Sequence, residues 1–120
     1  MHNYKEIKIW QRSRKLVKEI YLLIKKYPKE EIYGLTSQIR RAAISIPANI
    51  AEGAGRGTDK DFSRFLDIAR GSLFELETLI ILSNDLTFIT ESCSIEILEK
   101  TSEILRMLNS FQNNLSKSKV

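Results

Sequence analysis

Apolar residues recur along the chain at spacings of three and four positions, and this spacing predicts helices throughout. Sustained alternation of apolar and polar residues, which would indicate strands, is missing from the sequence. The pattern predicts four helices, at about residues 5–27, 35–53, 58–84 and 94–115. Because the connections between them are short, we expect an all-α, antiparallel up-down-up-down four-helix bundle, and the length favours one domain over residues 1–120.

Particular residues mark the expected ends of these helices. Pro28 is expected to end the first helix, because a residue that precedes a proline disfavours helical backbone. The glycine-rich stretch Gly53–Gly57 breaks the second pattern, and its glycines are expected to supply left-handed caps and turns. Thr58 and Ser94 are the expected N-caps of the third and fourth helices, because their hydroxyls can accept from free backbone N–H groups.

The third helix is apolar nearly all round over Leu73–Leu82, which does not suit a simple monomeric bundle. Counting about 100° per residue from the core face, Phe74 and Ile81 lie near 110° and Leu82 near 200°. One interpretation is that a second subunit buries these three residues, which would then form an oligomer interface. The other is that the 85–93 connection covers Phe74 and Ile81 within the chain.

The second helix carries a polar residue on the same side at every turn. Asn and Ser are weak helix formers, so helix propensity does not explain their places in this stripe. The structural interpretation is a satisfied polar network within or between subunits, and the functional one is a face for a ligand or nucleic acid. The stripe consists of Gln38, Arg41, Ser45, Asn49, Glu52 and Arg56.

The net charge of +4 is ordinary, but its distribution is uneven. Residues 1–60 hold 13 basic and 6 acidic side chains, whereas residues 61–120 hold 6 and 9. This asymmetry indicates self-association or an anionic partner, although two solvated faces that differ by chance would look the same. No exposed aromatic residue suited to base stacking is evident, so we expect electrostatic binding of RNA or DNA with little sequence specificity. The candidate contacts are Lys15, Lys18, Lys25, Lys26, Arg40, Arg56 and Lys60.

Residues for the common catalytic and metal-binding chemistries are scarce. The single His2 and the single Cys93 exclude multi-histidine metal sites, two-cysteine zinc sites and a disulfide framework within the chain. The best catalytic candidate, Glu52 beside Arg41 and Asn49, lacks a usable histidine and a clear nucleophile. We therefore expect no catalytic residues, no metal, no cofactor and no enzymatic activity. Without a signal peptide or an 18-residue apolar run, the chain is expected to be cytoplasmic, with no membrane partner.

Residues 38–56 carry a distinctive motif, QIRRAAISIPANIAEGAGR. It resembles the pattern Q-x-R-R-A-x-x-S-I-P-x-N-I-A-E-G-x-x-R of the bacterial four-helix-bundle proteins associated with 23S rRNA intervening sequences. The flanks agree with this family from about Tyr4 to Phe88, for example at Ile9-Trp10-Gln11 and at Ala69-Arg70-Gly71-Ser72-Leu73. The fourth predicted helix is the least family-specific segment.

The resemblance implies a four-helix bundle that assembles into a ring-like homopentamer. It also implies kinship with accessory proteins of diversity-generating retroelements, which are similar pentameric bundles that bind nucleic acid and a reverse transcriptase. The function we expect is that of a non-catalytic homo-oligomer whose partners are its own copies and RNA or DNA. The alternative is a protein–protein adaptor or accessory subunit, for example of a reverse transcriptase or another nucleic-acid-processing protein. Steep loss of RNA binding with salt would favour the first function over the alternative.

Overall fold

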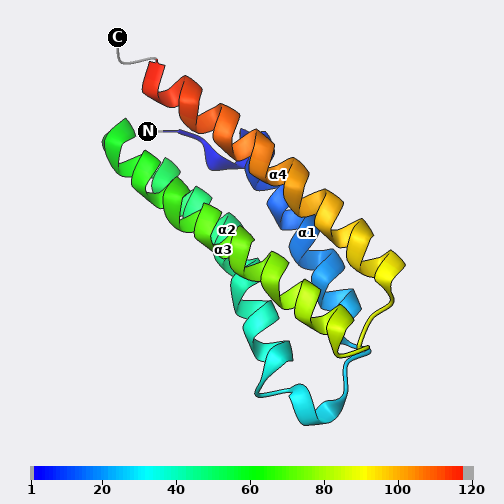
Figure 1. The fold of residues 1–120 in the computed structure, drawn as a ribbon. Helices are drawn as coiled ribbons and strands as arrows, with labels where there is room; N and C mark the ends of the chain where they lie inside the picture. The colour runs from blue at the N-terminus through cyan, green and yellow to red at the C-terminus, as the bar shows by residue number, and fades with distance from the viewer. Residues whose placement is uncertain (1, 118–120) are drawn as a thin grey trace.

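The computed structural model describes residues 2–117, and this part of the chain contains helices and turns but no strand. The 3₁₀ helices and α-helices, in chain order, are η1 (Tyr4–Glu6), α1 (Lys8–Ile24), η2 (Lys29–Glu31), α2 (Leu35–Ala54), α3 (Asp59–Asp85) and α4 (Glu91–Lys117). The four α-helices alternate in direction, and each packs against the next, with α4 returning to α1 (Figure 1). The described part measures 49 × 24 × 20 Å, and the predicted all-α four-helix fold is confirmed.

The core of the bundle is a single cluster of apolar side chains to which every α-helix contributes. These side chains recur at the three- and four-residue spacing of the sequence, because that spacing keeps them on one side of each helix. Removing them from water supplies the main force that holds the helices together. The largest fully buried apolar members are Leu16, Ile20, Ile39, Ile46, Ile50, Phe62, Leu66, Leu73, Leu76, Ile80 and Leu108.

Helix α2 ends at Ala54 without a left-handed glycine, so the predicted left-handed cap was wrong. No glycine among residues 2–117 has a positive φ, and the capping Gly55 has a φ of −85°. Gly53 instead lets α2 and α3 approach closely. A Cβ atom at Gly53 would lie 2.7 Å from Cβ of Phe65 and 2.8 Å from Cδ1 of Phe62. A side chain at this position would therefore force the two helices apart.

The N-caps of α3 and α4 differ in how well the sequence predicted them. Thr58 caps α3 as expected, since its Oγ1 accepts from the backbone N–H of Asp61 at 3.1 Å. The expected cap of α4, Ser94, lies buried inside the helix instead. The capping hydroxyl belongs to Thr90, whose Oγ1 accepts from the backbone N–H of Cys93 at 3.1 Å. Both hydroxyl residues are good N-caps, and only tertiary packing decides between them.

The outer helices also differ in length from their predicted ranges. Helix α1 begins at Lys8 rather than residue 5, because the extended backbone of Ile7 separates it from η1. It ends at Ile24, before Pro28 is reached. Helix α4 spans Glu91–Lys117 rather than 94–115.

Charged side chains join α4 to α1. Arg12 of α1 forms an ion pair with Glu103 of α4, and Glu19 of α1 forms one with Lys100 of α4. The hydrogen bond to Glu19 raises the pKa of the Lys100 ammonium group above its ordinary value. All four side chains remain partly solvated, so these pairs align the helices and add little to stability.

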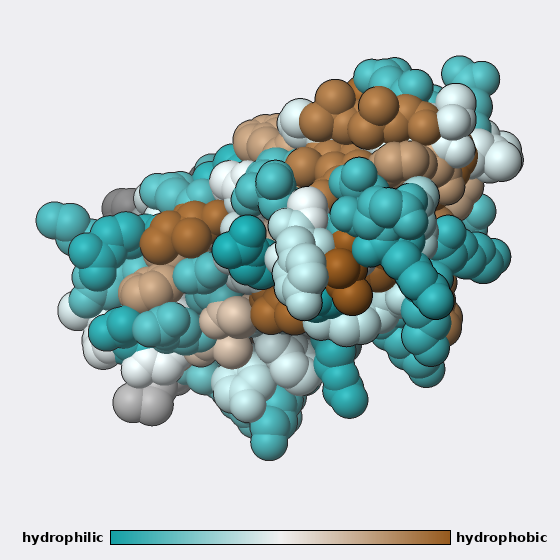
Figure 2. Space-filling view, turned by 90° about the horizontal axis from the view of Figure 1, so that it is seen from below, coloured by the Kyte–Doolittle hydropathy of each residue, from teal (hydrophilic) through white to brown (hydrophobic). Residues whose placement is uncertain are grey.

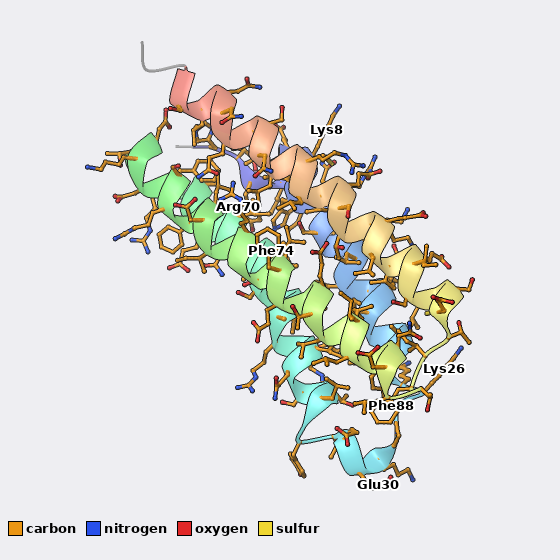
Figure 3. All side chains as sticks on the ribbon, viewed as in Figure 1. Lys8, Lys26, Glu30, Arg70, Phe74 and Phe88 are labelled. Carbon is orange, nitrogen blue, oxygen red and sulfur yellow. The ribbon has the colours of Figure 1, made fainter. Side chains whose placement is uncertain are left out.

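Arg70, which is labelled in Figure 3, joins α3 to α4. Its Nη2 donates to Oδ1 of Asn109 at 2.8 Å, and its Nη1 donates to Oδ1 of Asp67 at 2.9 Å. Gln112 contacts the same guanidinium and donates to the carbonyl of Ser63 at 3.0 Å. The contacts between α3 and α4 could not be read from residue spacing, unlike the i,i+3 pair of Arg70 with Asp67.

Candidate functional site

The predicted nucleic-acid contacts divide into two groups in the structure. The first group runs along α1 and onto α2: Lys15, Lys18, Lys25, Lys26 and Arg40. The second group, Arg56 and Lys60, lies at the α2–α3 turn, at the end of the bundle where the chain begins (Figure 1). Lys26 lies at the opposite end (Figure 3), so the seven residues do not form one continuous patch on a single chain.

The outer side of α1 is strongly basic. We call Arg14, Lys15, Lys18 and Lys25 the α1 basic face. All four side chains are exposed, and none forms an ion pair with another described residue. Glu19 is the one acidic residue within Lys8–Ile24, and it turns toward α4 and binds Lys100. The α1 basic face therefore presents a row of uncompensated positive charges, which attracts a polyanion.

Two cation–π pairs border the α1 basic face. The guanidinium carbon of Arg40 lies 5.7 Å from the ring centre of Tyr21, and that of Arg14 lies 5.5 Å from the ring of Trp10. A shallow, open depression of about 650 Å³ on the outer surface of α1, which we call the groove, lies between Arg14 and Tyr21. It is lined by Gln11, Arg14, Lys15, Val17, Lys18 and Tyr21.

The expectation that no aromatic residue is available for base stacking was wrong. Tyr21 is 36% exposed, although it recurs at helical spacing with the apolar residues Val17 and Ile24. The apolar stripe that they form is wider than the core, so Tyr21 sits at its edge, where its ring meets both Arg40 and solvent. The tertiary position of Arg40 on the neighbouring helix is needed to see this pair.

The cations at the α2–α3 turn are partly neutralised. Nη2 of Arg56 donates to Oε1 of Glu52 at 2.9 Å, and the guanidinium also lies 4.6 Å from the ring centre of Phe65. Arg64 approaches the same ring at 5.7 Å and lies 3.7 Å from an aspartate oxygen. Lys60 is exposed and has no ion pair with a described residue. This group therefore offers less free positive charge than the α1 basic face.

The inner part of the polar stripe on α2 is joined by hydrogen bonds. The amide of Asn49 donates to the Ser45 carbonyl at 2.8 Å and to its hydroxyl at 2.9 Å. The hydroxyl of Ser72 on α3 donates to the same Ser45 hydroxyl at 2.8 Å. These three side chains form a small polar contact between α2 and α3.

The rest of the stripe lies at the surface, so a fully buried network does not form within one chain. Glu52 and Arg56 form the expected i,i+4 pair, but their side chains are 57% and 43% exposed. The side chains of Gln38 and Arg41 are exposed, form no hydrogen bond with a described residue, and line an open pocket of about 640 Å³ with Glu75. Long charged side chains reach water easily, which is why the spacing alone overestimated burial.

Four large apolar side chains are exposed around the part of α3 that faces away from the core. Phe74, Ile81 and Leu82 are 49%, 48% and 42% exposed, and Ile68 on the same helix is 47% exposed. The interpretation that the 85–93 connection covers Phe74 and Ile81 is therefore wrong. Phe74 follows Arg70 by one helical turn (Figure 3). Figure 2 shows apolar areas between hydrophilic ones on one face of the molecule. Single exposed apolar side chains are common on protein surfaces, but four of them on one helix indicate a surface that favours contact with a protein.

Residues 2–117 offer few side chains for catalysis or metal binding. Glu52, the best catalytic candidate, binds Arg56, while Asn49 bonds to Ser45 rather than to Glu52. The described residues hold no group of three or more His, Cys, Asp or Glu side chains that could bind a metal ion. Within the same part of the chain, none of the helices has the length and apolar character needed to span a membrane.

The fold and these surfaces define a four-helix-bundle protein with a basic outer face on α1 and an apolar outer face on α3. The family model of the 23S rRNA-intervening sequence protein matches residues 5–110, and the chain belongs to this family. A crystal structure from the S23 ribosomal protein family, a Bacteroides thetaiotaomicron protein of unknown function, has a similar fold. The TM-score is 0.78 at 25% identity, over 87% of this chain and 97% of that one. No match was found among curated proteins.

Proposed function

We propose that the protein is a non-catalytic homo-oligomer that binds RNA or DNA through the α1 basic face. The observation that carries this proposal is the row of unpaired cations on α1, from which the helix's single carboxylate, Glu19, is turned away. Phosphate binding needs several accessible cations at one surface, and its strength grows with their number. We expect the α1 basic face to bind RNA or DNA of different sequences, since contacts to phosphates carry no information about the bases.

The oligomer in this proposal is a ring-like pentamer, as the family resemblance implies. Phe74, Ile81 and Leu82 support subunit contact, because half-exposed apolar side chains on one helix favour burial against a protein surface. A ring would repeat the α1 basic face, so one nucleic-acid strand could contact several subunits.

The second candidate is a protein adaptor in the cytoplasm, such as an accessory subunit of a reverse transcriptase. The exposed apolar face of α3 favours this candidate, since a partner protein could bind the surface that we assign to subunit contact. A kinship with retroelement accessory proteins, which the family resemblance implies, is compatible with both candidates. Salt dependence separates them, because apolar protein contacts respond far less to salt than phosphate contacts do.

The test is a titration of labelled RNA and DNA with the purified protein over a range of salt concentrations, followed by fluorescence anisotropy. The double variant Lys15→Gln/Lys18→Gln should weaken binding of both nucleic acids. It should also reduce the slope of log affinity against log salt by about 1.4 for a single strand if both lysines contact phosphates.

A matched control removes two unpaired charges elsewhere. Lys8→Gln/Arg106→Gln changes the net charge by the same amount, and these two residues line a different pocket, outside the α1 basic face. An equal loss in both double variants would show that net charge alone drives binding. Absence of RNA or DNA binding at about 50 mM salt by an intact oligomer would favour the adaptor instead.

A further inference from the structure

Beside the α1 basic face, one aromatic ring is both exposed and held in place. Tyr21 is 36% exposed, and the guanidinium carbon of Arg40 lies 5.7 Å from its ring centre. Arg40 has no ion pair with a described residue, so it can orient the ring and still attract a phosphate. An exposed aromatic ring beside free cations is the combination that binds unpaired bases.

We propose that the groove between Tyr21 and Arg14 binds single-stranded nucleic acid, with a base stacked on Tyr21 and the backbone along Lys15 and Lys18. This inference rests on the proposed nucleic-acid binding and names the class of strand that the same surface selects. The occupant follows from charge, because the open groove is lined by three cations, Arg14, Lys15 and Lys18, and by no acidic residue.

The length of the groove suits a short run of nucleotides. Arg14 and Tyr21 are seven residues apart on one helix, which places them on the same side and about 10 Å apart along its axis. A strand of stacked nucleotides rises about 3.4 Å per residue, so about three nucleotides span this distance. The Arg14 guanidinium, whose carbon lies 5.5 Å from the ring centre of Trp10, offers a second flat surface at the other end.

A duplex would use this surface less well than a single strand. Its bases are stacked on one another, so their faces are closed to Tyr21 and only the phosphates remain for the lysines. Stacking therefore adds affinity for single strands and none for duplexes. RNA and DNA single strands share the chemistry, since every base has a flat π face.

The experiment measures the affinity of the intact oligomer for oligouridine, oligothymidine, a duplex and an abasic strand of equal length at low salt. Tyr21→Ala should weaken both single strands about fivefold to hundredfold and leave the duplex and the abasic strand unchanged. Tyr21→Phe keeps the ring and should bind like the natural protein. A difference between oligouridine and oligothymidine would identify which single strand the groove prefers.

Tyr33→Ala is the matched control, because Tyr33 is 94% exposed and lies outside the groove. Equal weakening of single strands and duplex by Tyr21→Ala, or loss of the oligomer, would overturn the stacking role. Unchanged affinity of Tyr21→Ala for single strands would also overturn the stacking role. In that case the proposed function stands if Lys15→Gln/Lys18→Gln still weakens binding. Absence of binding to every probe by the natural protein would reject both.

Discussion

The outer faces of α1 and α3 are both exposed in the single chain, yet they carry opposite chemistry. The α1 basic face presents Arg14, Lys15, Lys18 and Lys25 without carboxylate partners, whereas α3 presents Ile68, Phe74, Ile81 and Leu82. Charged side chains are well solvated and need no cover, but a set of large apolar side chains on one helix favours removal from water. This difference is the reason why we propose polyanion binding for α1 and protein contact for α3.

The largest effect is expected when a charge is placed on the exposed apolar side of α3. Ile81→Glu should leave the monomer folded, because the Ile81 side chain is already 48% exposed. In the assembly the new carboxylate would be buried without a partner, which costs several kcal/mol, so we expect the oligomer to weaken by at least about 100-fold. Light scattering should show the mass falling toward the 13.9 kDa of one chain, with unchanged helical circular dichroism.

The matched control for that variant is Ile95→Glu. Ile95 is 52% exposed on α4, so the same change occurs on a different outer side. It should leave assembly intact. If Ile81→Glu lowers only the thermal stability, or if Ile95→Glu dissociates the oligomer equally, α3 is not the specific contact.

The helices were predictable because periodic burial requires only local spacing. Each α-helix contributes one stripe to a common core, and the stripes repeat every three or four residues. The cap of α4 was not predictable, because Thr90 and Ser94 are chemically equivalent caps and burial of Ser94 depends on the other helices. The role of Gly53 was misread for a similar reason, since its contact with Phe65 joins two helices.

The candidate site was predictable in composition but not in arrangement. The sequence located the lysines on the first helix, and helical spacing placed them on one side. It could not pair Arg40 with Tyr21, because these residues meet only when α2 packs on α1. It also could not show that Arg56 is partly neutralised by Glu52 and stacked near Phe65.

Between the two faces lies the polar stripe of α2, where a smaller effect is expected. Glu52→Ala should cost less than about 1 kcal/mol of unfolding free energy, because the pair with Arg56 is exposed. Asn49→Ala removes two hydrogen bonds to Ser45 and should cost more, on the order of 1–2 kcal/mol. Urea unfolding of both variants measures the difference. A cost of about 3–5 kcal/mol for Glu52→Ala would instead indicate burial of this pair between subunits.

The smallest effect is expected on the acidic outer side of α4. Glu96 and Glu99 are exposed there, and Lys100 keeps its bond to Glu19 when Glu96 is removed. At physiological salt, charges further apart than about 8 Å are largely screened, so these carboxylates should hardly affect a strand bound on the far side of α1. Glu96→Gln/Glu99→Gln should therefore change RNA affinity less than about twofold, measured by anisotropy alongside Lys15→Gln/Lys18→Gln. A large gain in affinity would place the strand near α4, and a loss of assembly would show that these carboxylates contact the basic side of a neighbouring subunit.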